Sequence, residues 1–175
     1  ALLMVTSTDY GATFSDPVVI AQSPDFVPFD QPPISANQEQ PPTFRTNAYP
    51  TIAVDGNGNV YVAIQEKRPE NDGPRIYIRT SKDLGKNWTR RGSLVDPKAP
   101  QNAHQVMPAM SFGGGQLRLM WYDFRAETQG LNAVGDSSPL VGGYITGYDR
   151  KMNVRLAQAI PGQNGSLSFG DSVPV

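Results

Sequence analysis

The chain has no cysteine among its 175 residues, which excludes a disulfide framework, a thiolate metal site and cysteine catalysis. The chain also lacks an excess of charge of either sign. Lys and Arg number 15 and Asp and Glu number 16, a net charge of −1, so no nucleic-acid partner is predicted. No apolar run approaches the roughly 18 residues that a membrane helix needs, so no membrane span is predicted. Residues 1–7 lack the basic stretch of a signal peptide and do not form one as they stand.

Glycine and proline, by contrast, are abundant, with 17 and 16 residues. Together they make up about 19% of the chain, where the average for globular proteins is roughly 12%. Both residues interrupt helices, proline by removing a hydrogen-bond donor and glycine through its conformational freedom. The composition therefore predicts short strands joined by many turns.

Two motifs each occur twice. Ser7–Phe14 and Ser81–Trp88 share the pattern Ser-x-Asp-x-Gly-x-x-aromatic, and each follows a short apolar run. In addition, 49–64 and 107–121 both read as a strand, a Gly-rich tight turn and a second strand, which is a strong hairpin signal. Such internal repetition indicates that the chain is built from copies of one unit.

The expected strands fall into three groups, of which the first is half a unit and the other two are complete units. They are 2–7 and 17–21; then 50–54, 60–66, 75–80 and 89–95; and then 108–112, 116–124, 153–160 and 167–174. The chain accordingly divides into a half blade (1–21), a Pro-rich inter-blade loop (22–48), a full blade (49–95) and a full blade with a long insertion (107–175). About two and a half units of four antiparallel strands predict an all-β fold, a portion of a β-propeller.

The Ser-x-Asp box has a structural interpretation. Its aspartate accepts hydrogen bonds from backbone N–H groups of the turn, and its glycine adopts a positive φ. Its aromatic side chain is expected to pack between neighbouring blades. We therefore expect eight structural residues in the two boxes: Ser7, Asp9, Gly11, Phe14, Ser81, Asp83, Gly85 and Trp88.

Both boxes resemble the Asp-boxes, or bacterial neuraminidase (BNR) repeats, of the sialidase superfamily. The stretches 49–67 and 107–125 are similar to the blade core that accompanies those boxes. The resemblance covers most of the chain apart from two long insertions. It implies a sialidase-like propeller that is secreted or at the cell surface. It also implies that the ring is completed by remaining blades of the same parent chain or by other copies.

One side of the predicted propeller carries every long connection, namely 22–48, 68–74, 96–107 and 125–152. The opposite side carries the short turns and the boxes. Long connections without secondary structure usually have a function. We call the first side the long-loop face and expect it to bind a glycan or protein ligand.

Resemblance to sialidases implies three arginines that bind a carboxylate, a Tyr–Glu nucleophile pair and an acidic proton donor. The candidates are Arg45, Arg68, Asp123 and Arg125, although Arg45 lacks the Ile-Pro that follows arginine in the family motif. Arg68 and Arg125 each follow an acid by two residues, and the repeats align these pairs. A single active site does not need the same acid-x-Arg pair twice, so structural pairing is the favoured interpretation. We therefore assign no catalytic residue.

Other polar groups receive structural interpretations as well. His104, the one histidine, is expected to be a solvated loop residue. The turn 55–59 superficially resembles a calcium loop but lacks the Glu that would be the twelfth-position ligand, so no metal and no cofactor are predicted. A small basic cluster near the second box is expected to be balanced by nearby acids: Lys86, Arg90 and Arg91 against Asp83 and Asp96.

Two functions follow from these patterns, and whether the protein is an enzyme stays open. The first is a non-catalytic Asp-box module that binds glycan or protein through the long-loop face. The alternative is part of an exo-sialidase-type glycoside hydrolase that cleaves terminal sialic acid. In that case its remaining catalytic residues would lie outside this segment.

Overall fold

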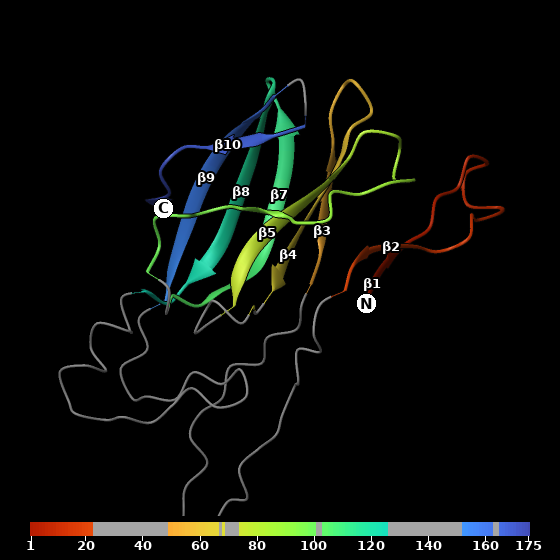
Figure 1. Cartoon of the computed structure of the whole chain (residues 1–175). Helices are drawn as coiled ribbons and strands as arrows, with labels where there is room; N and C mark the ends of the chain where they lie inside the picture. The colour runs from red at the N-terminus through yellow and green to blue at the C-terminus, as the bar shows by residue number, and fades with distance from the viewer. Residues whose placement is uncertain (23–48, 67, 69–73, 101–102, 126–151, 163–164) are drawn as a thin grey trace, which may run out of the picture.

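The computed structural model describes residues 1–22, 49–66, 68, 74–100, 103–125, 152–162 and 165–175. The regular elements of this part of the chain are β-strands, and every strand pair in it is antiparallel. The strands form three separate sheets. The all-β prediction is therefore confirmed. The described sheets lie side by side as an open array, without a closed ring (Figure 1).

Each sheet follows the chain order of its strands. The first contains β1 (Leu2–Met4) and β2 (Val18–Ala21). The second is a four-stranded meander of β3 (Thr51–Val54), β4 (Val60–Glu66), β5 (Arg75–Ser81) and β6 (Ser93–Leu94). The third contains β7 (Gln105–Gly113), β8 (Gln116–Asp123), β9 (Asn153–Pro161), β10 (Leu167–Phe169) and β11 (Val173–Pro174).

Three details differ from the sequence prediction. The last expected strand is two short ones, because β10 and β11 both pair with β9 and are separated by residues 170–172. The strand β6 is shorter than expected, at two residues. The strand β7 begins at Gln105, whereas we expected 108. It continues through an irregularity at Met107, whose φ is +52°. Pro108 therefore lies within the strand and not at its start.

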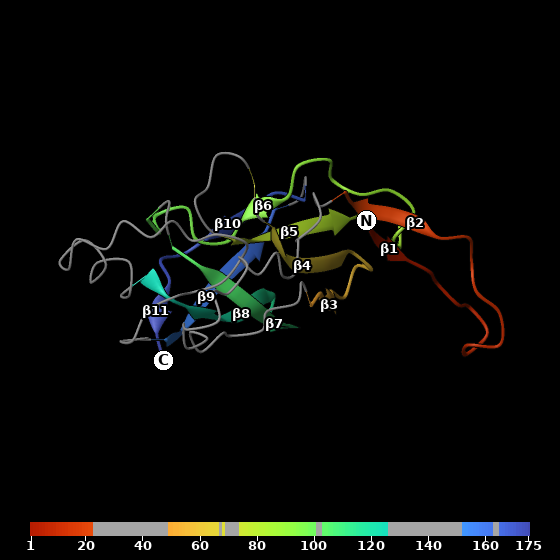
Figure 2. The same cartoon turned by 90° about the horizontal axis from the view of Figure 1, so that it is seen from below.

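The sheets pack through two apolar layers. Tyr61, Ile76 and Ile78 of the second sheet face Leu119 and Trp121 of the third, and all five side chains are buried. On the opposite side, Val62 and Ile64 pack with Ile20 and Ala21 of the first sheet. The alternation of these residues along β4 and β5 is what a strand buried on both faces requires. Figure 2 shows the two-stranded sheet at one side of the β3–β6 sheet.

The hairpin turn between β3 and β4 is organised by one carboxylate. Asp55 Oδ1 accepts the backbone N–H groups of Asn57 and Asn59, each over 2.9 Å. Its Oδ2 accepts the Asn59 side-chain amide over 2.7 Å and the Tyr61 hydroxyl over 2.9 Å. Burial would raise the pKa of Asp55, but these hydrogen bonds outweigh it and hold the pKa below 3.8. Both carboxylate oxygens of Asp55 thus accept hydrogen bonds that stabilise the turn.

The two boxes make the same hydrogen bonds. In each box the serine hydroxyl donates to the aspartate carboxylate over 2.8 Å and accepts the glycine N–H over 2.8 Å. The aspartate also accepts the backbone N–H of the residue four positions later, over 2.9 Å in the first box and 2.8 Å in the second. The partners are Ser7, Asp9, Gly11 and Thr13 in one box and Ser81, Asp83, Gly85 and Asn87 in the other.

The aromatic residues of the boxes differ in their surroundings. Trp88 is half-buried against the apolar layer between the first two sheets, as expected. Phe14, which we also expected to pack between sheets, is 64% exposed. The reason is that Trp88 has the first sheet beside it, whereas no described sheet lies on the corresponding side of Phe14. The conformation of the box therefore does not depend on burial of its aromatic residue.

Candidate binding site on the long-loop face

The ends of several strands gather charged residues at one edge of the second and third sheets. In the antiparallel register Glu66 at the end of β4 pairs with Arg75 at the start of β5, and Gln105 pairs with Asp123 at the end of β8. This edge is the long-loop face, opposite the short turns between β3 and β4 and between β7 and β8 (Figure 1). The candidate Arg45 lies outside the described residues.

Glu66 is held between two arginines on the second sheet. Arg68 donates to Oε2 from Nε over 2.9 Å and from Nη2 over 2.8 Å. Arg79 donates to Oε1 from Nη2 over 2.8 Å. The guanidinium carbon of Arg68 also lies 3.4 Å from the centre of the Tyr77 ring, a cation–π contact. Arg68 therefore has a fixed orientation, and its Nη1 group takes no part in these bonds.

Asp123 is the centre of a second cluster, on the third sheet. Arg125 binds it in a bidentate manner, with Nε to Oδ1 and Nη2 to Oδ2 both at 2.7 Å. The Trp121 indole N–H donates to Oδ2 over 3.0 Å. Burial would raise the pKa of Asp123, but the hydrogen bonds from Arg125 and Trp121 outweigh it and hold the pKa below 3.8. Asp123 is therefore a permanent carboxylate at neutral pH.

Asp96 connects the two sheets across this face. It follows β6, and its Oδ2 accepts Arg125 Nη2 over 2.5 Å and the Ser172 hydroxyl over 2.6 Å. Arg155 of β9 in turn donates from Nε to the Ser172 hydroxyl over 2.9 Å. The side chain of Arg75 donates to the backbone carbonyl oxygen of Asp96. These contacts fix the residues that follow β6 against the third sheet.

The two acid-x-Arg pairs that align in the sequence therefore both form ion pairs, but only one of the two arginines also binds an acid outside its own sheet. Arg68 stays within its own sheet, where it shares Glu66 with Arg79. Arg125 joins its own sheet to the residues after β6. Their common pattern places a guanidinium group at the end of the second strand of each four-strand unit.

His104 is buried, with 4% of its surface exposed, so our expectation of a solvated loop residue was wrong. The cause is its place one residue before β7, where its carbonyl oxygen accepts the Phe124 N–H over 3.0 Å. That bond extends the pairing of β7 and β8 beyond the strand end and draws the histidine inward.

The long-loop face is rich in positive charge compared with the whole chain. Among the described residues, five arginines and three acids form its clusters, an excess of two positive charges, whereas the whole chain has a net charge of −1. The residues are Arg68, Arg75, Arg79, Arg125 and Arg155 with Glu66, Asp96 and Asp123. Such an arrangement favours the binding of an anion. Of these side chains Asp123 is an unsuitable proton donor, because its pKa is lowered.

Sequence reasoning found Arg68, Arg125 and their acids but missed the arginines of β5. Arg75 and Arg79 flank Tyr77 at every second position of the run Arg-Ile-Tyr-Ile-Arg. This alternation of polar and apolar residues in a strand was the signal that could have found them, because it places all three on one side of the sheet.

No helix in the described part of the chain is long and apolar enough to cross a membrane.

No family model and no curated protein matches this chain. Among solved structures it is similar to a Trypanosoma rangeli sialidase in complex with the inhibitor DANA, at 15% identity and a TM-score of 0.47. It is also similar to a mutant of Trypanosoma rangeli sialidase displaying trans-sialidase activity, at 16% identity and a TM-score of 0.47. The matches cover 74% and 89% of this chain but only 20% and 24% of those chains. These likenesses concern the backbone alone.

Proposed function

We propose that this chain is a portion of a secreted or cell-surface Asp-box β-propeller that binds an acidic glycan through its long-loop face without cleaving it. The observation that carries the proposal is the gathering of five guanidinium groups against three carboxylates at one end of two sheets. The repeated meander and the matching hydrogen bonds of the two boxes support the propeller architecture.

Arg68 is the anchor of the proposed site. Glu66 and the ring of Tyr77 hold its guanidinium group in place, which lowers the entropy lost when a ligand binds. Its Nη1 group makes no hydrogen bond to the described residues, and we expect it to donate to the carboxylate of a sugar acid. Because the guanidinium is planar and always charged, this contact is directional and independent of pH in the physiological range.

The outer faces of the array support a larger ring. Leu3 and Val19 are exposed on the first sheet, and Met120 and Ile160 are exposed on the third. Large apolar side chains on a sheet face favour burial against another layer. We infer that remaining blades of the same parent chain, or other copies, cover these faces.

The alternative is part of an exo-sialidase-type hydrolase. Two of its candidate groups, Asp123 and Arg125, bind each other and are already committed to the contact between sheets. Such an enzyme would draw its proton donor and its nucleophile from residues other than the clusters of this face. The geometry described here therefore favours binding over hydrolysis.

Calorimetric titration of the protein with sialyllactose tests the proposal, with lactose as the neutral comparison. We expect saturable binding of sialyllactose alone. Arg68→Met should weaken it about tenfold, because a hydrogen bond to a charged group contributes roughly 1.5 kcal/mol or more. Arg118→Met is the matched control, since Arg118 binds the Gly113 carbonyl oxygen at the opposite end of the sheet. Equal affinity for lactose, or an equal loss in both variants, would contradict the proposal.

A further inference from the structure

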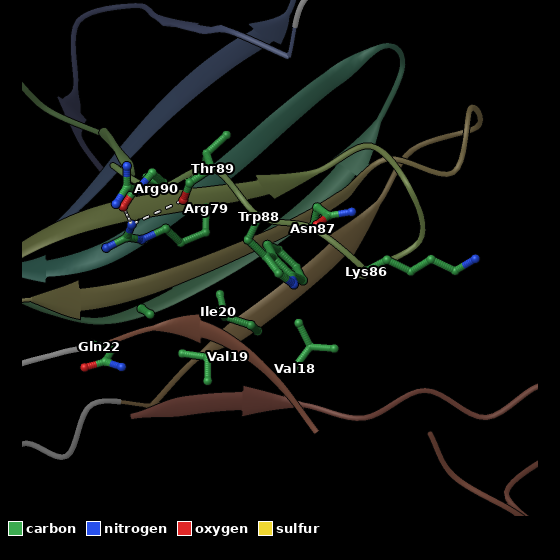
Figure 3. Close-up of a pocket in the computed structure, with 11 residues that line it drawn as sticks. Val18, Val19, Ile20, Gln22, Arg79, Lys86, Asn87, Trp88, Thr89 and Arg90 are labelled. Carbon is green, nitrogen blue, oxygen red and sulfur yellow. Dashed lines mark hydrogen bonds between the residues drawn. The ribbon is translucent and has the colours of Figure 1, made fainter. Parts of the chain in front are cut away.

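A cavity of about 520 Å³ lies between β2 and residues 86–90, which end the second box and follow it. Its walls come from β2, through Val18 and Ile20, from β5, through Arg79, and from the connection between β5 and β6, through Lys86, Trp88 and Arg90 (Figure 3). This place is away from the clusters around Asp123. Its volume falls in the range of roughly 300–1,000 Å³ that is typical of small-molecule sites.

The charge of the cavity lining has one sign. Among the described residues, three cationic side chains line it and no acid does. Arg79 is neutralised by Glu66. Lys86 and Arg90 are exposed, and among the described residues neither takes part in an ion pair. In Figure 3 they lie on opposite sides of Trp88.

The acids that we expected to balance this basic cluster are engaged elsewhere. Asp83 accepts hydrogen bonds from Ser81 and from Asn87 within its own box. Asp96 pairs with Arg125 on the long-loop face. The expectation of a balanced cluster was therefore wrong, because the fold directs both carboxylates away from the cavity.

Trp88 gives the cavity a flat apolar wall. Its indole N–H donates to the Gly85 carbonyl oxygen over 2.9 Å, which fixes the orientation of the ring. It packs against the apolar layer of Ile20 and remains half-buried. A fixed indole ring offers a stacking surface for the apolar face of a ring-shaped ligand.

We propose that this cavity is a second binding site, for an acidic saccharide that carries sulfate or carboxylate groups. A sugar ring would lie on Trp88, and its anionic substituents would reach Lys86 on one side and Arg90 on the other. The hydroxyl groups would meet the exposed polar side chain of Gln22, which also lines the cavity. The inference does not depend on the site proposed around Arg68.

A saccharide fits these observations better than a nucleic acid. Nucleic-acid binding draws on an extended basic surface, because each neutralised phosphate adds to affinity. Among the described residues that line the cavity, two cations take part in no ion pair, in a chain of net charge −1. A short ligand with one or two anionic groups matches that charge.

The two tryptophans allow a direct test. Trp121 is buried, whereas Trp88 lines the cavity, so a ligand there should change the fluorescence of Trp88. The probes are a heparin-derived tetrasaccharide, a hyaluronan tetrasaccharide and neutral chitotetraose. We expect a saturable change with the first, the second or both, and none with the neutral sugar. Trp88→Phe should abolish the signal.

The variant Lys86→Glu/Arg90→Glu should weaken acidic-saccharide binding at least tenfold, since both charges are reversed. The control is Lys98→Glu/Arg118→Glu, which changes the net charge equally at exposed positions outside the cavity lining. It should change the affinity measured by Trp88 fluorescence less than twofold, which separates the effect of the cavity cations from that of net charge. Unchanged melting temperatures would verify folding. The proposal is overturned by no saturable change, by equal binding of chitotetraose, by equal losses in the control, or by tighter binding of a single-stranded oligonucleotide.

Discussion

Replacing Arg125 by methionine should destabilise the protein far more than the same change at Arg68. Arg125 neutralises two buried carboxylates, because Asp123 has no exposed side-chain surface and that of Asp96 is 4% exposed. Its removal leaves neither carboxylate with an ion pair among the described residues, and Arg75 then acts on both only over a longer distance. Glu66, by contrast, keeps Arg79 at 2.8 Å when Arg68 is replaced.

The magnitudes follow from this difference. Removing one partner of a buried ion pair costs roughly 3–5 kcal/mol, and we expect Arg125→Met to fall in that range. Arg68→Met removes one of the two cations that bind Glu66 and the contact with Tyr77, and because Arg79 still neutralises Glu66 we expect a cost of about 1–2 kcal/mol. The gap between the two variants should therefore be about 1–4 kcal/mol in the free energy of unfolding.

Urea unfolding followed by tryptophan fluorescence measures this gap, and Trp121 reports directly because its indole N–H binds Asp123. The pH dependence adds a second test. In the native protein the lowered pKa of Asp123 contributes stability above pH 3.8, which is lost as the pH falls below that value. Without Arg125, burial raises this pKa, so the cost of the substitution should shrink as the medium is acidified. Equal losses for Arg125→Met and Arg68→Met at neutral pH would refute the interpretation.

Three further outcomes are expected. Gly85→Ala should lower the melting temperature more than Gly11→Ala does. Both glycines have a φ of +89°, but an added Cβ at position 85 would lie 2.8 Å from Met4 Cε, whereas one at position 11 would have no atom within 4 Å. NMR titration should give Asp83 a pKa of about 2, because the Asn87 side chain donates a hydrogen bond to its carboxylate. Its contribution to stability is therefore complete above pH 3.8 and is lost as the pH falls through about 2. Asp55→Ala should cost about 2–3 kcal/mol in urea unfolding, because it removes the acceptor of four hydrogen bonds.

The strands could be predicted because their signals are local. The turn 55–59 and the two boxes mark where strands end, and the apolar run at the start of Val60–Glu66 marks the strand between them. The structure places β4 at the residues expected. The early start of β7 could not be predicted, because Gln105 joins the sheet by pairing with Asp123, a contact between distant parts of the chain.

The charged clusters were predictable only in part. The repeat alignment identified the acid-x-Arg pairs of Arg68 and Arg125, since that pattern lies within three consecutive residues. It could not show that Asp96 joins Arg125, because 29 positions separate them and only the packing of two sheets brings them together. The same holds for Phe14, whose exposure depends on which sheet stands beside it.

The measurement that tests the central claim most directly is one NMR sample of the protein with sialyllactose. Saturation-transfer spectra show whether the sugar binds, and the signals of free sialic acid show whether it is cleaved. We predict transfer to the sialic acid ring, reduced in the Arg68→Met variant, with the sialyllactose intact after prolonged incubation. Release of free sialic acid would contradict the non-catalytic assignment, and absence of transfer would contradict binding at the long-loop face.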